Sequence, residues 1–261
     1  MSWAFWAAFV LQDTPGDPLC VHRTARIRIV DPVGRTREIH REERVWIAPN
    51  RVRIEDLTFG RDLLILLDSR KLVLIDRPGK THSETSFDDI ASRRKAFLEE
   101  LALARARVRE TPEDEPLARL EQALRLESEE GKAEPTGRRE SILGRPCVEA
   151  QILIDGKIQA ARHFIDPSFP DGAGYLRALA AIHGLSPQSA AAARGDAFKG
   201  LPVRGVVRYV LGVDRVQSEE EVTAIERKSA PRGIFEPPEG SKVVPFAAAR
   251  ELPVPGFEEK K

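Results

Sequence analysis

The chain has 261 residues, of which 41% are apolar, and its 41 basic and 41 acidic side chains give a formal net charge of zero. Proteins that bind nucleic acid generally present a net positive face to the phosphates, so this balance argues against nucleic acid as a partner. The length fits one large β domain or two small ones, and the apolar fraction is enough to build a sizeable core.

Residues 1–11 read MSWAFWAAFVL, an uncharged apolar run. The run has the length of a signal-peptide core and is too short to span a bilayer. It lacks a basic n-region, and no A-x-A cleavage site follows. We interpret residues 1–19 as an imperfect signal segment, which predicts a periplasmic or cell-envelope protein whose membrane contact is at most peripheral. The alternative is a buried N-terminal segment of a cytosolic protein.

The chain has two cysteines, Cys20 and Cys147, which are too few for a disulfide framework or a C-x-x-C metal site. A single bridge between them requires that the protein is exported and that their two strands meet. The alternative is a pair of unpaired, half-buried thiols. The sequence leaves both open.

Residues 20–86 show the period-two pattern of half-buried strands. Ala25, Ile27 and Ile29 alternate with Arg26 and Arg28, which predicts a strand with one face in water. Turn signals recur about every ten residues, as in a meander of antiparallel strands.

One hairpin in this region has a different pattern. Residues 63–67 and 72–75 are almost wholly apolar on either side of a turn at residues 68–71. A strand that is apolar on both faces is covered on both faces. We therefore expect other parts of the chain to lie on each side of this hairpin.

Residues 88–128 change to helical spacing. Ser86 fits the N-cap of a first helix, and Thr111 followed by Pro112 fits the start of a second. The first helix would present these apolar residues on one side: Ile90, Phe97, Leu101, Ala104 and Val108. We predict a helical hairpin inserted over residues 88–130. A charge-rich helical pair is most often a solvated lid or spacer, and a docking surface for a protein partner is the alternative.

The second β region follows a polar stretch, residues 131–137, which we interpret as a linker. Asp155 and Gly156 form a strong signal for a two-residue hairpin turn. The remaining predicted elements are helices over 175–183 and 187–194 and strands over 203–213 and 217–228. We expect one domain over residues 20–246 and a disordered tail over 247–261, where proline and charge dominate.

Sequence motifs for catalysis are missing. The five histidines lie far apart and have no zinc-site spacing: His22, His40, His82, His163 and His183. No G-x-S-x-G elbow and no cysteine in a protease context occurs. We therefore predict a non-enzymatic protein with no catalytic residues, no metal site and no cofactor.

The order of several phrases resembles the LolA-like superfamily, especially its domain-of-unknown-function branch DUF4412. The phrases are spread over both halves of the chain and lie at residues 43–55, 64–76, 80–84, 142–147, 201–204, 222–225 and 231–240. The helical insertion at 88–130 is longer than the family's pattern. The resemblance implies a mainly β (α+β) fold, in which a strongly curved antiparallel sheet forms an incomplete barrel and helices cover its concave face. Related members carry lipoproteins through the periplasm or sense envelope stress.

A half-barrel has an apolar inner face that is too wide for its own side chains to fill. Either helices fill it permanently, or a lipid or lipidated protein occupies it. The alternative function is that an envelope protein partner docks on the 88–130 hairpin. Seven residues are expected to line the concave side, with ordinary core as the alternative for each: Trp46, Ile54, Leu66, Leu74, Ile152, Phe164 and Tyr209.

Overall fold

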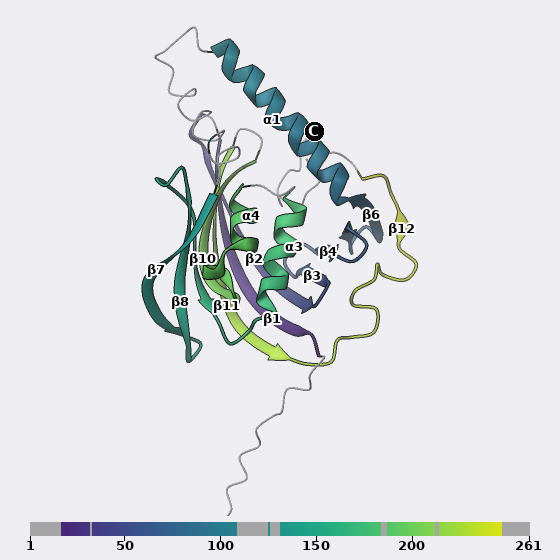
Figure 1. Cartoon of the computed structure of the whole chain (residues 1–261). Coiled ribbons are helices and arrows are strands. Elements are labelled where there is room, and N and C mark those ends of the chain that lie inside the picture. The colour runs from purple at the N-terminus through teal and green to yellow at the C-terminus, as the bar shows by residue number, and fades with distance from the viewer. Residues whose placement is uncertain are drawn as a thin grey trace, which may run out of the picture.

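The computed structural model describes residues 17–31, 33–108, 125, 131–183, 187–211 and 214–246. Its strands form one twelve-stranded sheet in the order β12-β6-β5-β4-β3-β2-β1-β11-β10-β9-β8-β7. The sheet curves strongly around the helices α3 and α4 and does not close into a barrel (Figure 1). The expected fold class, a strongly curved open antiparallel sheet with covering helices, is confirmed.

The elements in chain order are β1 (Leu19–Val30), β2 (Thr36–Ala48), β3 (Arg51–Asp56), β4 (Arg61–Leu66), β5 (Lys71–Asp76), β6 (Thr81–Ser86), α1 (Phe87–Val108), β7 (Gly131–Ile142), β8 (Arg145–Ile154), β9 (Ile158–Asp166), α3 (Gly172–Ile182), α4 (Pro187–Arg194), the 3₁₀ helix η1 (Asp196–Phe198), β10 (Leu201–Leu211), β11 (Asp214–Arg227) and β12 (Lys242–Val243).

At the centre of the sheet, a strand from the start of the chain pairs with a strand from its C-terminal part. β1 pairs with β2 on one side and with β11 on the other, so the two meanders meet there. All neighbouring strands are antiparallel except β12, which pairs in parallel with β6 over two residues. The predicted hairpin turn between β8 and β9 is present, and Asp155 and Gly156 both have positive φ, at 52° and 64°. Positive φ at both central residues is what a type I′ turn requires.

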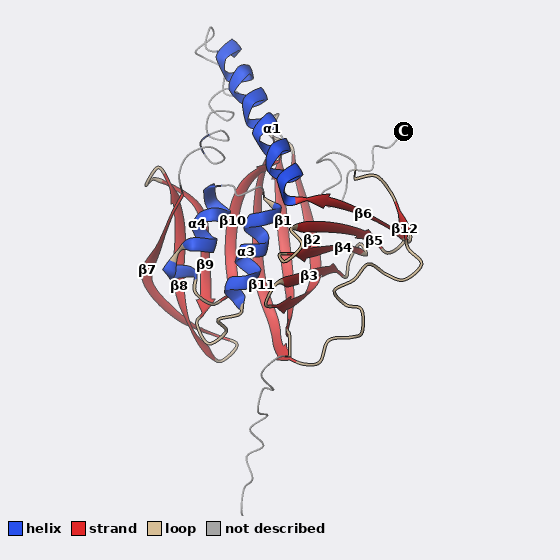
Figure 2. Cartoon of the chain, turned by 45° about the vertical axis from the view of Figure 1, so that its right-hand side comes forward, coloured by secondary structure: helices blue, strands red, loops and turns tan. Residues whose placement is uncertain are grey.

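Two short helices cover the inner face of the sheet, which is the face toward α3 and α4 (Figures 1 and 2). α3 lies close to the backbone of β10. A Cβ atom at Gly172 would come within 2.4 Å of Leu201 Cα, so this approach needs a residue without a side chain. We call the space that the inner face encloses the trough.

The apolar hairpin β4–β5 is covered on both faces, as expected. Ile65 and Leu72 are fully buried in the cluster that includes α3. Leu64 and Val73 belong to a second cluster on the outer face, where Phe235 packs against them. Phe235 belongs to residues 228–246, a segment that runs across the outer face and that we call the C-terminal strap.

The helical insertion begins as predicted. The amide of Asp89 donates to Ser86 Oγ at 3.0 Å, so Ser86 caps α1. The predicted second helix falls outside the described residues except for residue 125, which is helical. The signal segment up to residue 16 and the tail over 247–261 also fall outside them. No helix in the described part of the chain is long and apolar enough to cross a membrane.

The interpretation of residues 131–137 as a linker is wrong, because β7 begins at Gly131. β7 is an edge strand, and its register with β8 shifts between Pro135 and Arg139. Edge strands carry proline, charges and bulges because these features prevent pairing with other chains. The same features make the stretch look like a linker in the sequence. Both cysteines, Cys20 and Cys147, are buried and free.

Candidate functional site

The part of the trough between β1 to β5 and α3 is apolar, and side chains fill it. A single buried cluster joins the inner faces of β1 to β5 with Tyr175, Ala178 and Ile182 of α3. The strand residues in it are Leu19, Val21, Val45, Ile47, Val52, Ile54, Ile65 and Leu72. α3 therefore lies where a bound apolar chain would have to lie.

Four of the seven predicted lining residues are on the inner face. Ile54 and Leu74 belong to the cluster under α3. Ile152 packs in the cluster formed with α3 and α4. Tyr209 packs with Val216 in a separate cluster at the ends of β1 and β11. The structure thus spreads these four residues along the trough, and ligand contact by any of them stays a prediction.

The other three predicted residues are on the outer face, so their expected inward position is corrected. Trp46 Nε1 donates to Glu55 Oε2 at 2.9 Å, and the Trp46 ring lies under Lys228 of the C-terminal strap. Leu66 packs against the cluster that contains Phe235. Phe164 pairs across the sheet with Arg204, whose guanidinium lies 4.7 Å from the centre of the Phe164 ring.

Charged side chains interrupt the apolar inner face near its centre. Arg23 Nη2 lies 2.6 Å from Glu43 Oε2, and the two side chains are only 10% and 5% exposed. Arg23 Nη1 lies 2.9 Å from Glu220 Oε2 and also donates to the Tyr175 hydroxyl of α3. Arg41 and Asp56 extend this group, with 3.7 Å between Arg41 Nε and Asp56 Oδ2. We call Arg23, Arg41, Glu43, Asp56 and Glu220 the buried polar cluster.

The buried polar cluster sets the protonation of its members. Burial alone would raise the pKa of Glu43, yet the Arg23 and Arg41 guanidiniums hold it below its ordinary value. Burial also raises the pKa of the Tyr175 hydroxyl, which stays neutral. Burial lowers the pKa of His163, which lies beside the cluster. The inner face of the sheet, which forms the floor of the trough, therefore carries the charges of the buried polar cluster and the neutral imidazole of His163.

Sequence reasoning missed this cluster, although a signal for it exists. Arg23 occupies an inward position in the alternation that contains Val21 and Ala25, and Glu43 occupies the inward position before Val45. The two residues are directly opposite each other in the β1–β2 register. A charge at an inward position in each of two paired strands is the pattern that would have indicated a buried pair.

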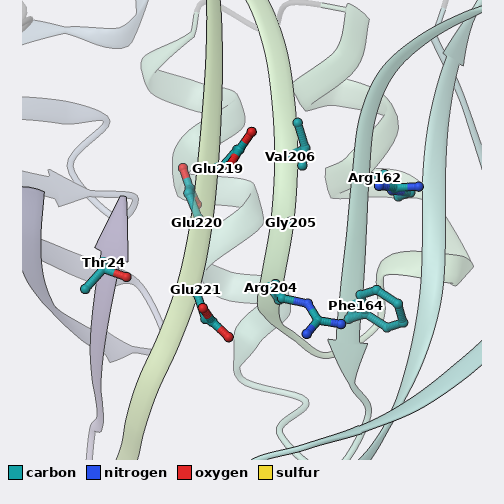
Figure 3. Close-up of a pocket in the computed structure, with 9 residues that line it drawn as sticks. All are labelled: Thr24, Arg162, Phe164, Arg204, Gly205, Val206, Glu219, Glu220 and Glu221. Carbon is teal, nitrogen blue, oxygen red and sulfur yellow. The ribbon is translucent and has the colours of Figure 1, made fainter. Parts of the chain in front are cut away.

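A hollow of about 250 Å³ lies on the outer face, on the side of the sheet away from the helices (Figure 3). It is lined by Thr24, Arg162, Phe164, Arg204, Gly205, Val206, Glu219, Glu220 and Glu221. The carboxylates come from β11, whereas the guanidiniums come from β9 and β10. Because these walls are charged, the hollow is unsuited to an acyl chain. Among the described residues, no group of three or more His, Cys, Asp or Glu side chains could hold a metal ion.

Comparison with known proteins gives weak likenesses only. No protein-family model matches the chain, and no curated protein matches it either. Among solved structures, an uncharacterized conserved protein from Thermus thermophilus is similar at 9% identity and a TM-score of 0.45, over 89% of this chain and 92% of that one. A LolA superfamily protein from Nitrosomonas europaea is similar at 11% identity and a TM-score of 0.30, over 85% and 91%. A DUF1329 family protein from Desulfovibrio piger is similar at 8% identity and a TM-score of 0.29, over 87% and 92%. These scores are too low to assign the chain to a family.

Proposed function

We propose that this protein is a non-enzymatic, extracytoplasmic binding protein of LolA-like, DUF4412-type kinship. Its ligand is an acyl chain of a lipid or of a lipidated protein, held in the trough after α3 and α4 move aside. The observation that carries the proposal is the nature of the cover. In the described part of the chain, the apolar inner face of β1 to β5 packs against short helices and not against a second sheet.

The cover is made largely of small residues, which lowers the free energy needed to move it. α3 and α4 bury Ala178, Ala180, Ala191 and Ala192 against the sheet. The larger apolar side chains that α3 contributes to the two clusters are Tyr175, Leu176, Leu179 and Ile182. At about 1.5–3 kcal/mol for each large side chain, their exposure would cost roughly 6–12 kcal/mol.

An acyl chain can offset that cost. Burial contributes about 0.8 kcal/mol per methylene, so a chain of about sixteen carbons yields roughly 12 kcal/mol. The exchange of helix for acyl chain is therefore close to balanced, which is what a carrier that loads and releases its cargo needs. A cover that cost much more than this would act as permanent core.

The charges on the trough floor favour a neutral ligand. Two arginines, Arg23 and Arg41, face three carboxylates, Glu43, Asp56 and Glu220, so the buried polar cluster has a formal charge of −1. A free carboxylate brought into this low-dielectric region would be repelled. We therefore propose an esterified or amide-linked acyl chain in preference to a free fatty acid.

The test is titration of the purified full chain with a neutral lipophilic fluorescent probe. Leu74→Gln and Leu66→Gln form a matched pair, because both leucines are partly buried on the same hairpin, one on each face. We expect saturable binding that Leu74→Gln weakens at least about tenfold and Leu66→Gln leaves nearly unchanged. Absence of saturable binding, or equal loss in both variants, would contradict the proposal.

A second function is favoured by the position of α1. Its first turn joins the core through Phe87 and Ile90, and the 22-residue helix then projects past the sheet (Figure 2). A projecting helix suits an envelope regulatory module that docks a protein partner. Replacing residues 88–130 by a short linker should then abolish binding to that partner while the circular-dichroism signal of the sheet persists. A partner that still binds would end this alternative.

A further inference from the structure

His163 occupies an unusual position on the inner face of β9. It lies opposite Gly205 of β10, and a Cβ atom at Gly205 would be 2.1 Å from His163 Nδ1. The imidazole therefore fills the space that a side chain at position 205 would take. Its other close neighbour is the Phe198 ring, which meets it edge to face at 5.8 Å between centres. Within the part of the chain that the structure describes, neither ring nitrogen has a hydrogen bond.

The charged groups that face His163 belong to the buried polar cluster. Glu220 of β11 favours the protonated imidazole, whereas burial and Arg23 of β1 oppose it; burial is the largest of these effects, and together they lower the pKa of His163. On the other sides, β10 presents Gly205, η1 presents Phe198, and β8 presents Ala150, none of which carries a charge. The neutral hydroxyl of Tyr175 reaches the same Arg23 from α3.

A small void beside this histidine has wall residues in common with the hollow on the outer face. A small void of about 10 Å³, with space for about one water molecule, is lined by His163, Arg23 and Glu220 among others. This void shares Arg204, Gly205, Glu220 and Glu221 with the larger outer hollow (Figure 3). The β10–β11 pairing begins only at Arg204 and Glu221, so the void opens where the two strands separate.

We propose that His163 is an acid-sensitive release for the cover helix α3. Protonation places a second positive charge beside Arg23 and gives Glu220 a new partner. Arg23 is then repelled by the imidazolium and loses part of its hold on Glu220. Because Arg23 is also the donor to Tyr175, a contact that fastens α3 to the sheet weakens near the middle of the trough, while the pair of Arg227 with the N-cap residue Asp171 is not involved. The biological use of such a release rests on the proposed function, whereas the release itself does not.

The direction of the pH effect follows from the lowered pKa. An imidazole free of this environment titrates near about 6.5. The closed state disfavours the proton, so its extra stability is fully present above that pH and is lost as the pH falls toward the lower pKa of the closed state. A single group changes the opening equilibrium by at most about tenfold per pH unit.

Hydrogen exchange of the unliganded full chain tests the proposal. Amides of α3 (Gly172–Ile182) are compared at about pH 7.5 and about pH 5.5, after correction for intrinsic rates, in wild type and in His163→Phe. The phenyl ring keeps the volume beside Gly205 and cannot take a proton. We expect protection of α3 in the wild type to fall about tenfold in acid, and His163→Phe to show no fall. His183→Gln, at the C-cap of α3, is the matched control and should behave as the wild type.

An equal loss of protection in His163→Phe, or none in the wild type, would overturn the proposal. If His163→Phe does not fold, the wild-type imidazole can be titrated by NMR. Its midpoint must then lie below about pH 6.5, and α3 protection must fall between about pH 6.5 and that midpoint; a midpoint at or above about pH 6.5, or a loss of protection outside this window, would overturn the release. Probe binding is a separate readout. Its failure would remove the acyl-chain function while leaving the acid release standing.

Discussion

The hydroxyl of Tyr175 on α3 accepts a hydrogen bond from Arg23 on β1, although the two residues are 152 positions apart. The Arg23 guanidinium also lies over the Tyr175 ring, 5.3 Å from its centre. Arg23 is itself fixed by Glu43 and Glu220, so the cover helix is tied to a residue that cannot move freely. This polar contact thus joins the cover helix to the buried polar cluster of the sheet.

Tyr175→Phe removes this contact and keeps the ring. We expect a loss of about 1–2 kcal/mol in the free energy of unfolding, because a buried guanidinium loses one acceptor. Protection of α3 amides should fall by more than the global stability does, since the contact belongs to the cover. Urea unfolding and hydrogen exchange measure the two quantities.

Tyr209→Phe is the control for that substitution. Tyr209 also lies beside the buried polar cluster, and burial raises the pKa of its hydroxyl to about 12. Its hydroxyl has no hydrogen bond among the residues that the structure describes. An effect of Tyr209→Phe on α3 as large as that of Tyr175→Phe would contradict a specific role for the Tyr175 hydroxyl.

Glu43→Gln tests the electrostatics of the trough floor. Above about pH 4.5, where the ordinary glutamate is ionised, the variant should be about 3 kcal/mol less stable, because Arg23 and Arg41 lose a buried charged partner. The folded pKa of Glu43 lies below its ordinary value, so its stabilisation is present above that value and is lost as the pH falls through the folded pKa. The difference between wild type and variant should therefore shrink in acid.

Urea unfolding at several pH values checks this expectation. Glu38→Gln removes a carboxylate from an exposed pair with Arg26 and provides the comparison. Its effect should be much smaller, because water screens that pair. A Glu43→Gln deficit that stays constant down to the lowest pH would show that the carboxylate is not the charged partner inferred here.

Arg53→Met should loosen the C-terminal strap. Arg53 is buried on the outer face, where it donates to the carbonyl oxygens of Ile234 at 2.9 Å and Glu236 at 3.3 Å and to Asp62 at 2.7 Å. The variant leaves a buried carboxylate with less compensation, which costs about 3–5 kcal/mol. Limited proteolysis within residues 229–246 should become faster. Arg51→Met, on the same strand but in an exposed pair with Asp68, should leave proteolysis unchanged.

The sequence predicts the strands of the curved sheet well, because apolar and polar residues alternate clearly in strands that expose one face to water. It predicts the inner face poorly where both faces are covered. Val45, Trp46 and Ile47 are each only 2% exposed, so period two shows which residues share a face but not which face lies inside the curve. The strap residues that cover Trp46 and Leu66 are Lys228 and Phe235, which come 182 and 169 positions later in the chain. No local sequence pattern indicates this contact.

The polar part of the site was missed for a related reason. Arg23 and Glu43 come from consecutive strands, whereas Glu220 comes 197 positions after Arg23. Each of them looks like one more charge in a sequence that is 31% charged. Only the register of β1 with β2 and β11 brings them to one level of the trough. The burial of these three charged side chains depends on α3, which packs over them, and the pattern of the strands alone does not indicate where α3 lies.

Gly205→Ala tests the close fit between β10 and His163. The added methyl would lie 2.1 Å from His163 Nδ1, a distance that real Cβ atoms do not show, so the imidazole must move. Because His163 is held by Phe198 and the strands around it, we expect a loss of about 1–3 kcal/mol in the free energy of unfolding. The φ angle of Gly205 is not in the left-handed region, so backbone strain contributes nothing to this cost.

A double-mutant cycle isolates the contact. His163→Ala removes the ring that the new methyl would meet, and in that background Gly205→Ala should cost much less than it does alone. The two substitutions should therefore be less destabilising together than the sum of their separate effects. Strictly additive effects, measured by urea unfolding at about pH 7.5, where the imidazole is neutral, would show that His163 does not occupy the space over Gly205.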